Sequence, residues 1–240
     1  MITYLLYAQN LYFGEKTMNI KLFMSAIIKF SLGVVLVGLL IFLPAGTLAY
    51  TYGWILMGVL FIPMFIAGFV MMAKNPELLK SRLNAKEKEK EQGLVLKLSA
   101  LMFISGFVIA GLGYRFDWYM FPLPVVIVGA VLFLISYVLY AEVLRENTYL
   151  SRTIEVKEDQ KVIDTGLYGI VRHPMYSATL LLFLSMPLIL GSLFSLIIFI
   201  AYPFIIGFRI KYEEKYLEEN LAGYKEYKKK VKYRLIPFIF

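Results

Sequence analysis

The sequence predicts an all-α integral membrane protein with about six transmembrane helices, and three observations lead to this fold class. Hydrophobic residues make up 60% of the 240-residue chain and charged residues only 18%. The mean hydropathy of +0.69 is far above that of a soluble domain. Apolar runs of about 20 residues, the length that crosses a bilayer, recur along the chain, and the charges cluster between them.

Four apolar runs are each long enough for one transmembrane helix: 30–49, 54–73, 94–113 and 122–141. A fifth apolar region, 176–208, is too long for one helix. It contains Pro187 and the turn-like pair Gly191-Ser192, so we expect a hairpin of two shorter helices there. Residues 1–17 carry no run of this length and are expected either to lie along the membrane interface or to precede a true start at Met18.

The charge pattern supports this count and predicts an orientation. The linkers 74–97 and 142–175 and the segment after 208 are rich in Lys and Arg, whereas the intervening turns carry one Arg and one Asp in total. Such alternation predicts that both termini lie in the cytoplasm. The net charge of +8 then favours contact with anionic membrane lipids, and we expect no nucleic-acid partner.

Composition also excludes several kinds of chemistry. The chain has no cysteine and one histidine, which excludes thiolate catalysis and argues against a histidine-rich metal site. A carboxylate-only Mg²⁺ site remains open in principle. The first four spans hold no ionisable pair at mid-depth, which argues against a transporter or channel.

The only histidine lies in the stretch GLYGIVRHPMY, residues 166–176, after a turn predicted at 164–166. Proline is favoured at the first position of a helix, so Arg172 and His173 are expected at the N-terminus of the fifth span. The free N–H groups there attract an anion, and the guanidinium of Arg172 adds donors. The alternative is that both residues lie at the interface and contact lipid headgroups.

Two further features follow the last apolar run. Arg209 and Glu213 are four residues apart and share a helix face, either as part of a site or as an ordinary surface ion pair. Five tyrosines are interleaved with lysines before Pro237: Tyr212, Tyr216, Tyr224, Tyr227 and Tyr233. This pattern favours an amphipathic interfacial helix with an aromatic belt.

Together these features resemble the C-terminal region of the isoprenylcysteine carboxyl methyltransferase family, whose wider circle includes the phospholipid N-methyltransferases. The matching residues occur in this order: Gly166-Leu167-Tyr168, Arg172-His173-Pro174-Met175-Tyr176, Arg209, Glu213-Glu214, Gly223-Tyr224, Tyr227, Val231 and Pro237. The resemblance covers residues 150–240, and the segment 75–82 resembles the prokaryotic branch. We therefore expect one membrane-embedded domain, with four helices in 1–149 and a cytoplasmic catalytic region in 150–240.

The resemblance implies S-adenosylmethionine as methyl donor and no metal. Carried over by position, the cofactor-binding residues would be Gln160, Lys161, Val162, Ile163, Tyr168, His173, Pro174, Met175, Tyr176 and Glu213. Arg209 matches the substrate-side arginine, and Arg209 and Glu213 are the candidate catalytic residues. Two positions depart from the family: Gln160 stands where a histidine is frequent, and a glutamine expected around 153–156 is missing.

The chemistry of methyl transfer indicates which acceptor to expect. A carboxylate is ionised at neutral pH and needs no base, and Arg209 could orient it. An amine must lose a proton, which Glu213, Glu214 or His173 could accept. We expect a lipophilic carboxylate, as in isoprenylcysteine-like O-methylation. Small prenyl-thio acids, isoprenoid acids and phospholipid amines remain open as acceptors, and so does the oligomeric state.

Two functions of other kinds also remain open. One is a membrane NAD(P)H-dependent sterol or enone reductase, whose C-terminal half has a related layout. Its phosphate-bearing cofactor calls for more basic residues near 145–175 than the chain has. The other is a non-enzymatic membrane transporter or assembly protein that retains the fold and binds neither cofactor.

Overall fold

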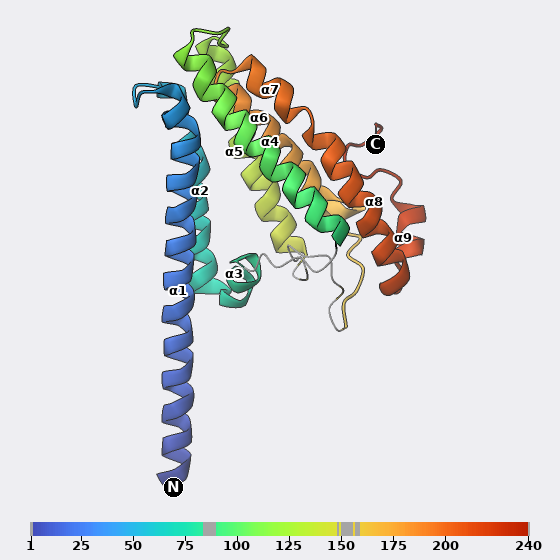
Figure 1. The fold of residues 1–240 in the computed structure, drawn as a ribbon. Coiled ribbons are helices and arrows are strands. Elements are labelled where there is room, and N and C mark those ends of the chain that lie inside the picture. The colour runs from blue at the N-terminus through green and yellow to red at the C-terminus, as the bar shows by residue number, and fades with distance from the viewer. Residues whose placement is uncertain (1, 84–89, 148, 150–155, 157–158, 240) are drawn as a thin grey trace.

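The computed structural model describes residues 2–83, 90–147, 149, 156 and 159–239, which fold into the helical bundle shown in Figure 1. The helices are α1 (Ile2–Ala45), α2 (Thr51–Lys74), α3 (Pro76–Leu83), α4 (Lys90–Arg115), α5 (Leu123–Glu146), α6 (Pro174–Ile189), α7 (Leu193–Phe199), α8 (Tyr202–Asn220) and α9 (Tyr224–Lys230). A short 3-10 helix, η1 (Gly166–Gly169), precedes α6. The described residues confirm the all-α prediction, with a single isolated β-bridge as the exception.

Five segments are long and apolar enough to cross a membrane: Ile20–Ala45, Thr51–Lys74, Gly93–Arg115, Leu123–Glu146 and Leu193–Asn220. α6 is also apolar but has only 16 residues. The described helices therefore comprise five long spans and one shorter apolar helix, where six spans were predicted. Large apolar side chains such as Leu43 and Val138 are exposed on the outer faces, as contact with lipid requires. The chain is an integral membrane protein, and the cytoplasmic orientation stays a prediction.

The first span lies earlier in the chain than the apolar run 30–49 predicted. α1 ends at Ala45 because Gly46 takes a positive φ of 68°, which begins the turn into α2. On its other side the span includes Lys29, whose Nζ donates to the carbonyl oxygen of Leu83 at the end of α3 (2.8 Å). Residues 2–19 continue α1 as a straight helix and do not lie along the interface as a separate segment (Figure 1).

α3 is a helix that the apolar runs did not predict. It begins at an Asn-Pro pair: the side-chain oxygen of Asn75 accepts the backbone N–H of Leu78 at 3.0 Å, and Pro76 occupies the first helical position. Leu79 is fully buried, which packs α3 against α1 and α2. The segment 75–82, which resembles the prokaryotic branch of the family, is therefore a short helix. It follows the C-terminal end of α2, within the linker 74–97.

The helical hairpin predicted in 176–208 is present, with its turn at Gly191-Ser192. Gly191 has a φ of 67°, and its carbonyl oxygen accepts the N–H of Phe121 (2.6 Å), which ties the α4–α5 loop to this turn. The second arm is interrupted at Ile200-Ala201, between α7 and α8, where Pro203 follows in the first turn of α8. α8 then continues beyond the apolar region to Asn220 and carries Arg209 and Glu213 out of the hydrophobic run.

α5 and α6 form the most extensive helix pair of the bundle. They approach closely because α5 presents Gly129 to α6: a Cβ there would lie 2.8 Å from the Cβ of Leu188 and 3.0 Å from the backbone nitrogen of Ile189. This packing places the C-terminus of α5 beside the N-terminus of α6. The polar linker 147–173 starts and ends at this point, so the chain between the two helices returns to the same end of the bundle.

Candidate functional site

A cavity lies where the C-terminal end of α5 and the N-terminal end of α6 meet α8 and α9. Its empty space amounts to about 820 Å³, including the part open to solvent. The residues that line it are Asn147, Tyr149, Gln160, Lys161, Val162, Ile163, Tyr168, Arg172, His173, Met175, Tyr176, Arg209, Glu213, Leu217, Leu221, Tyr224 and Tyr227. Polar, charged and aromatic side chains thus converge at one end of an otherwise apolar bundle.

One wall of the cavity is built by η1, which is anchored to the end of α5. Both carboxylate oxygens of Glu146 accept the N–H of Leu167, at 3.2 and 3.0 Å, so a side chain of α5 caps the first turn of η1. The side-chain amide of Asn147 donates to the hydroxyl of Tyr168 at 3.0 Å. Burial raises the pKa of Tyr168 to about 12, so it is a neutral hydroxyl at physiological pH.

Gly166 is required by this anchoring, as the turn predicted at 164–166 suggested. Its φ is 51°, and a Cβ would lie 1.4 Å from Oε1 of Glu146. We expect Gly166→Ala to destabilise the fold by roughly 1–3 kcal/mol from backbone strain alone, with a further cost from the clash. Thermal unfolding in detergent measures this effect. Gly207→Ala is the control, because no atom lies within 4 Å of its Cβ position, and an unchanged Tm for Gly166→Ala would contradict the assignment.

Arg172 is a buried structural link in this site. Its Nε donates to Oε1 of Glu214 at 2.7 Å, and its Nη1 donates to the carbonyl oxygens of Val231 and Lys232, both at 2.8 Å. These partners lie on α8 and in the segment after α9. Because Nε and Nη1 bind these protein partners, the prediction that they donate to an anion is wrong. The alternative of contact with lipid headgroups is wrong as well, because the side chain is only 5% exposed.

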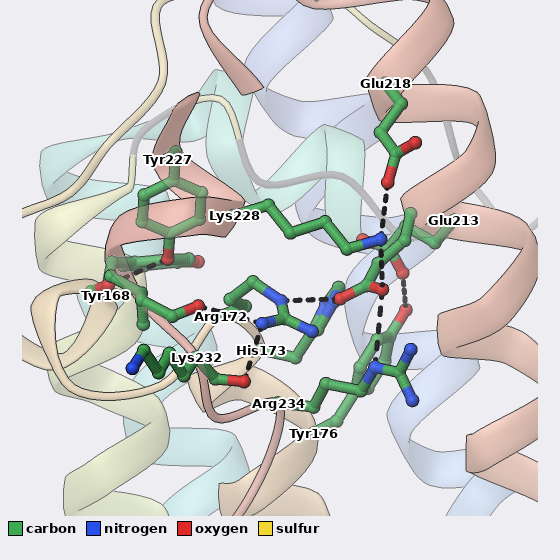
Figure 2. A network of polar contacts seen from close by, with 12 residues as sticks. Tyr168, Arg172, His173, Tyr176, Glu213, Glu218, Tyr227, Lys228, Lys232 and Arg234 are labelled. Carbon is green, nitrogen blue, oxygen red and sulfur yellow. Dashed lines mark hydrogen bonds and ion pairs between the residues drawn. The ribbon is translucent and has the colours of Figure 1, made fainter. Parts of the chain in front are cut away.

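Glu214 gathers three cationic side chains and the imidazole of His173 around one buried carboxylate. Its Oε1 contacts Arg172 and the Nε2 of His173 (3.3 Å), and its Oε2 lies 3.4 Å from Lys228 and 3.3 Å from Arg234. Figure 2 shows these cations converging from α6, α9 and the tail that follows it. The carboxylate therefore joins three segments, and its oxygens are committed to these contacts. Glu214 is a poor candidate for the proton acceptor that an amine substrate needs.

The segment after α9, residues 231–239, is called the tail. It pairs with the N-terminus of α6: the N–H groups of Arg172 and His173 donate to the carbonyl oxygens of Tyr233 and Arg234, both at 2.9 Å. His173 and Pro174 stand at the N-terminus of α6, as predicted. Fewer N–H groups are therefore available there to bind an anion, since the His173 N–H is already bound to the tail and Pro174 has no N–H.

Tyr176 connects the two residues that the sequence singled out on α8. Its hydroxyl accepts from Nε of Arg209 at 2.8 Å and donates to Oε2 of Glu213 at 2.5 Å. The ring of His173 stacks against the ring of Tyr176, with the centroids 5.7 Å apart. Arg209, Tyr176 and Glu213 therefore form a connected polar row along the cavity wall, in place of a simple surface ion pair.

Two tyrosines of the predicted aromatic belt are buried within the site. Tyr224 and Tyr227 pack with Leu221 and Val231 in a second hydrophobic cluster, against Val162 of the cavity loop. The hydroxyl of Tyr227 donates to the carbonyl oxygen of Tyr168 at 2.7 Å. Burial raises the pKa of both tyrosines well above its usual range. The interfacial-belt interpretation is wrong for these two residues because α9 turns its tyrosine face toward the protein.

The loop that carries residues 160–163 is held against α9. Val156 and Val162 pack on the α9 cluster, and Nζ of Lys230 lies 2.7 Å from Oδ2 of Asp164. This contact with Lys230 lowers the pKa of Asp164. The segment 153–156, where the sequence lacks a glutamine that is expected in the family, falls outside the described residues, apart from Val156.

The structure brings together nearly all of the residues assigned from the resemblance. Gln160, Lys161, Val162, Ile163, Tyr168, His173, Met175, Tyr176, Arg209 and Glu213 share the cavity, whereas Pro174 is buried at the first position of α6. Their binding and catalytic roles stay predictions. The residues that the sequence did not assign are Asn147, Tyr149, Leu217 and Leu221. Only the i, i+4 spacing of Leu217 and Leu221 gave a signal, since it extends the helix face of Glu213.

Comparison with known proteins finds a family model that matches this region. Residues 124–223 match the model of the phospholipid methyltransferase family. The matched segment runs from α5 to the residue before α9 and includes most of the cavity wall. The match confirms the resemblance to the wider group that includes the phospholipid methyltransferases. The resemblance to the isoprenylcysteine carboxyl methyltransferase family within that group stays a prediction. No curated protein matches the chain. The phospholipid methyltransferase match and the apolar helices indicate a membrane methyltransferase.

Proposed function

We propose that the chain is an S-adenosylmethionine-dependent methyltransferase that acts on a lipophilic acceptor, with a carboxylate as the accepting group. The observation that carries this proposal is the single cavity at the end of the spans. It gathers ten residues that the resemblance assigns to cofactor and substrate, from four separate segments of the chain. Such convergence of a loop, η1, α6 and α8 supports a ligand site over a set of unrelated surface contacts.

The lining of the cavity fits the proposed methyl donor. The donor has an adenine ring, a ribose and a charged amino acid part. Aromatic and aliphatic side chains such as Tyr168 and Leu217 suit the ring, and Glu213 suits the ribose or the ammonium group. When bound, this donor supplies a methyl group on a positively charged sulfur.

The protein residues would bind, orient and exclude water. His173 and Met175 would form the floor of the cofactor site at the start of α6, and the α9 cluster would cover it. Arg209 lines the same cavity and lies on α8 where the helix leaves its apolar part. In this position it would hold an acceptor carboxylate whose lipophilic body remains between the spans. Because Tyr176 joins Arg209 to Glu213, donor and acceptor would be oriented by one row of hydrogen bonds.

A phospholipid amine is the second candidate acceptor. The matching family is named for phospholipid methylation, and an amine must lose a proton during the reaction. Of the three acceptors considered from the sequence, Glu214 is occupied by cations and His173 contacts Glu214. Glu213 remains, since its carboxylate lies in the cavity wall and accepts from Tyr176.

Donor binding tests the proposal directly. We expect saturable S-adenosylmethionine binding to the purified protein, weakened about 10- to 100-fold by His173→Ala and by Glu213→Ala. This range corresponds to a lost hydrogen bond to a charged group, about 1.5–3 kcal/mol. Titration calorimetry in detergent measures it, with NADPH titrated in parallel. Glu142→Ala is the control, because neither Glu142 nor its exposed partner Arg145 lines the cavity.

Each outcome of this titration decides between functions. Binding that both site variants weaken and the control preserves supports the methyltransferase assignment. NADPH binding without S-adenosylmethionine binding would move the protein to the reductases. Folded protein that binds neither molecule would overturn the enzyme assignment.

A further inference from the structure

The tail does more than pair with α6, because it brings an apolar turn to the edge of the bundle. The hydroxyl of Ser177, in the first turn of α6, donates to the carbonyl oxygen of Leu235 at 2.6 Å. Leu235 is buried in the main hydrophobic core, together with residues of the spanning helices. After α9 the chain therefore runs back beside the bundle (Figure 1).

The residues that follow Leu235 form a turn that directs apolar side chains outward. The N–H of Ile239 donates to the carbonyl oxygen of Ile236 at 3.2 Å. Within this turn Phe238 is 87% exposed and Ile239 is 78% exposed. The Phe238 ring contacts Tyr233 of the same tail. Exposure of such large apolar side chains to water is unfavourable, so the turn needs an apolar environment.

Exposed basic side chains lie on α9 and in the part of the tail that precedes this turn. Lys225 and Lys229 are exposed on α9, and Lys232 is exposed in the tail. An apolar turn that follows exposed lysines has the composition of a segment that binds the interface of an anionic membrane. The outer face of α8 adds exposed Phe204 and Phe208.

We propose that the turn Ile236–Ile239 inserts Phe238 and Ile239 into the headgroup–acyl boundary of the bilayer that the protein spans. The exposed lysines of α9 and the tail then contact anionic headgroups. This membrane contact is independent of the proposed function, since it rests on the fold of the tail and its exposed side chains. Membrane contact would also restrain the tail, whose carbonyl groups accept hydrogen bonds from Arg172 and His173.

Tryptophan fluorescence in lipid nanodiscs tests the depth of the turn. Both native tryptophans, Trp54 and Trp118, are first replaced by phenylalanine, and Phe238→Trp is introduced in that background. The nanodiscs contain phosphatidylcholine and phosphatidylglycerol, with or without bromine on the acyl chains. We expect brominated lipid to quench most of the F238W emission and aqueous acrylamide to quench little of it. Glu219→Trp is the matched control, because Glu219 is exposed in the charged C-terminal part of α8, beyond its apolar residues.

The outcomes separate lipid from other environments. F238W emission that brominated lipid quenches, at a shorter wavelength than the E219W emission, supports insertion. Quenching by acrylamide alone would place the turn in water and overturn the proposal. Emission that neither quencher reaches would mean that protein covers the turn, for instance a second copy, and would overturn it as well.

A second comparison tests the contribution of the lysines. Quenching of F238W by brominated lipid is expected to be stronger in nanodiscs with phosphatidylglycerol than in phosphatidylcholine alone. Lys229→Gln together with Lys232→Gln is expected to remove most of this difference. An unchanged difference in the double variant would show that these lysines do not contact the headgroups.

Discussion

Arg209→Ala is expected to lower kcat/KM for a lipophilic carboxylate acceptor by about two to three orders of magnitude. Removing one partner of a buried, hydrogen-bonded charge contact costs about 2–5 kcal/mol, and each 1.4 kcal/mol is tenfold. Arg209 is 8% exposed and bound to the Tyr176 hydroxyl in the cavity wall. Methyl transfer from labelled S-adenosylmethionine to a prenylated thio acid measures the change. Arg209→Lys is expected to be intermediate, because lysine keeps the charge but loses the planar donor fork.

The control variant and the donor titration make this result specific. Arg145→Ala removes an arginine that is 74% exposed on α5 and should leave the rate unchanged. Donor affinity should be retained in Arg209→Ala if the site still folds. A near wild-type kcat/KM would show that Arg209 does not anchor the acceptor. Activity on a phospholipid amine that survives Arg209→Ala but is lost in Glu213→Ala would identify the amine as the acceptor.

Glu214→Ala is expected to cause the largest loss of stability. Its side chain is 4% exposed and that of Arg172 is 5% exposed, so the substitution leaves a buried guanidinium without its carboxylate. Breaking a buried pair in this way costs about 3–5 kcal/mol, which corresponds to a fall in Tm of about 10 °C for a chain of this size. Arg172, Lys228 and Arg234 lose the same partner, and although Lys228 keeps its pair with Glu218 on α8, the links of Arg172 and of the tail to α8 are lost. Thermal unfolding in detergent measures the effect.

Glu142→Ala is the matched control for this prediction. Its carboxylate also pairs with an arginine, but the two side chains are 37% and 74% exposed. An exposed pair contributes at most about 1 kcal/mol, so the Tm should change by no more than about 3 °C. Equal shifts for the two variants would show that Glu214 is no more than a surface partner.

The sequence predicted the spans well because hydropathy reports the part of a helix that lipid surrounds. It predicted helix ends poorly, since charged residues such as Lys74 and Glu142–Glu146 continue a helix outside the apolar run. The first span was displaced for a related reason: the run 30–49 continues past Gly46, where backbone conformation ends the helix. α3 was missed because its eight residues are too short and too polar for the length criterion.

The candidate site was predicted through its local motifs, and its long-range contacts were not. Residues 160–176 are close in sequence, so a family-like pattern could identify them together. The partners of Arg172 lie 42 and 59 positions away, on α8 and in the tail, and no spacing rule connects them. The tyrosines of α9 had the alternation of an interfacial helix. Such a pattern shows that one face is apolar, and it leaves open whether lipid or protein covers that face.

The pairing of the tail with residues 172 and 173 has a consequence for biosynthesis. The guanidinium of Arg172 finds its carbonyl partners about 60 positions downstream, at Val231 and Lys232. During translation the spanning helices can enter the bilayer one after another, while the cavity wall still lacks these groups. The site is thus completed after membrane insertion, once residues 231–235 have left the ribosome and docked on α6. Under the proposed function, donor binding would report this last step of maturation, and a nascent chain arrested before Val231 is expected to be inserted but inactive.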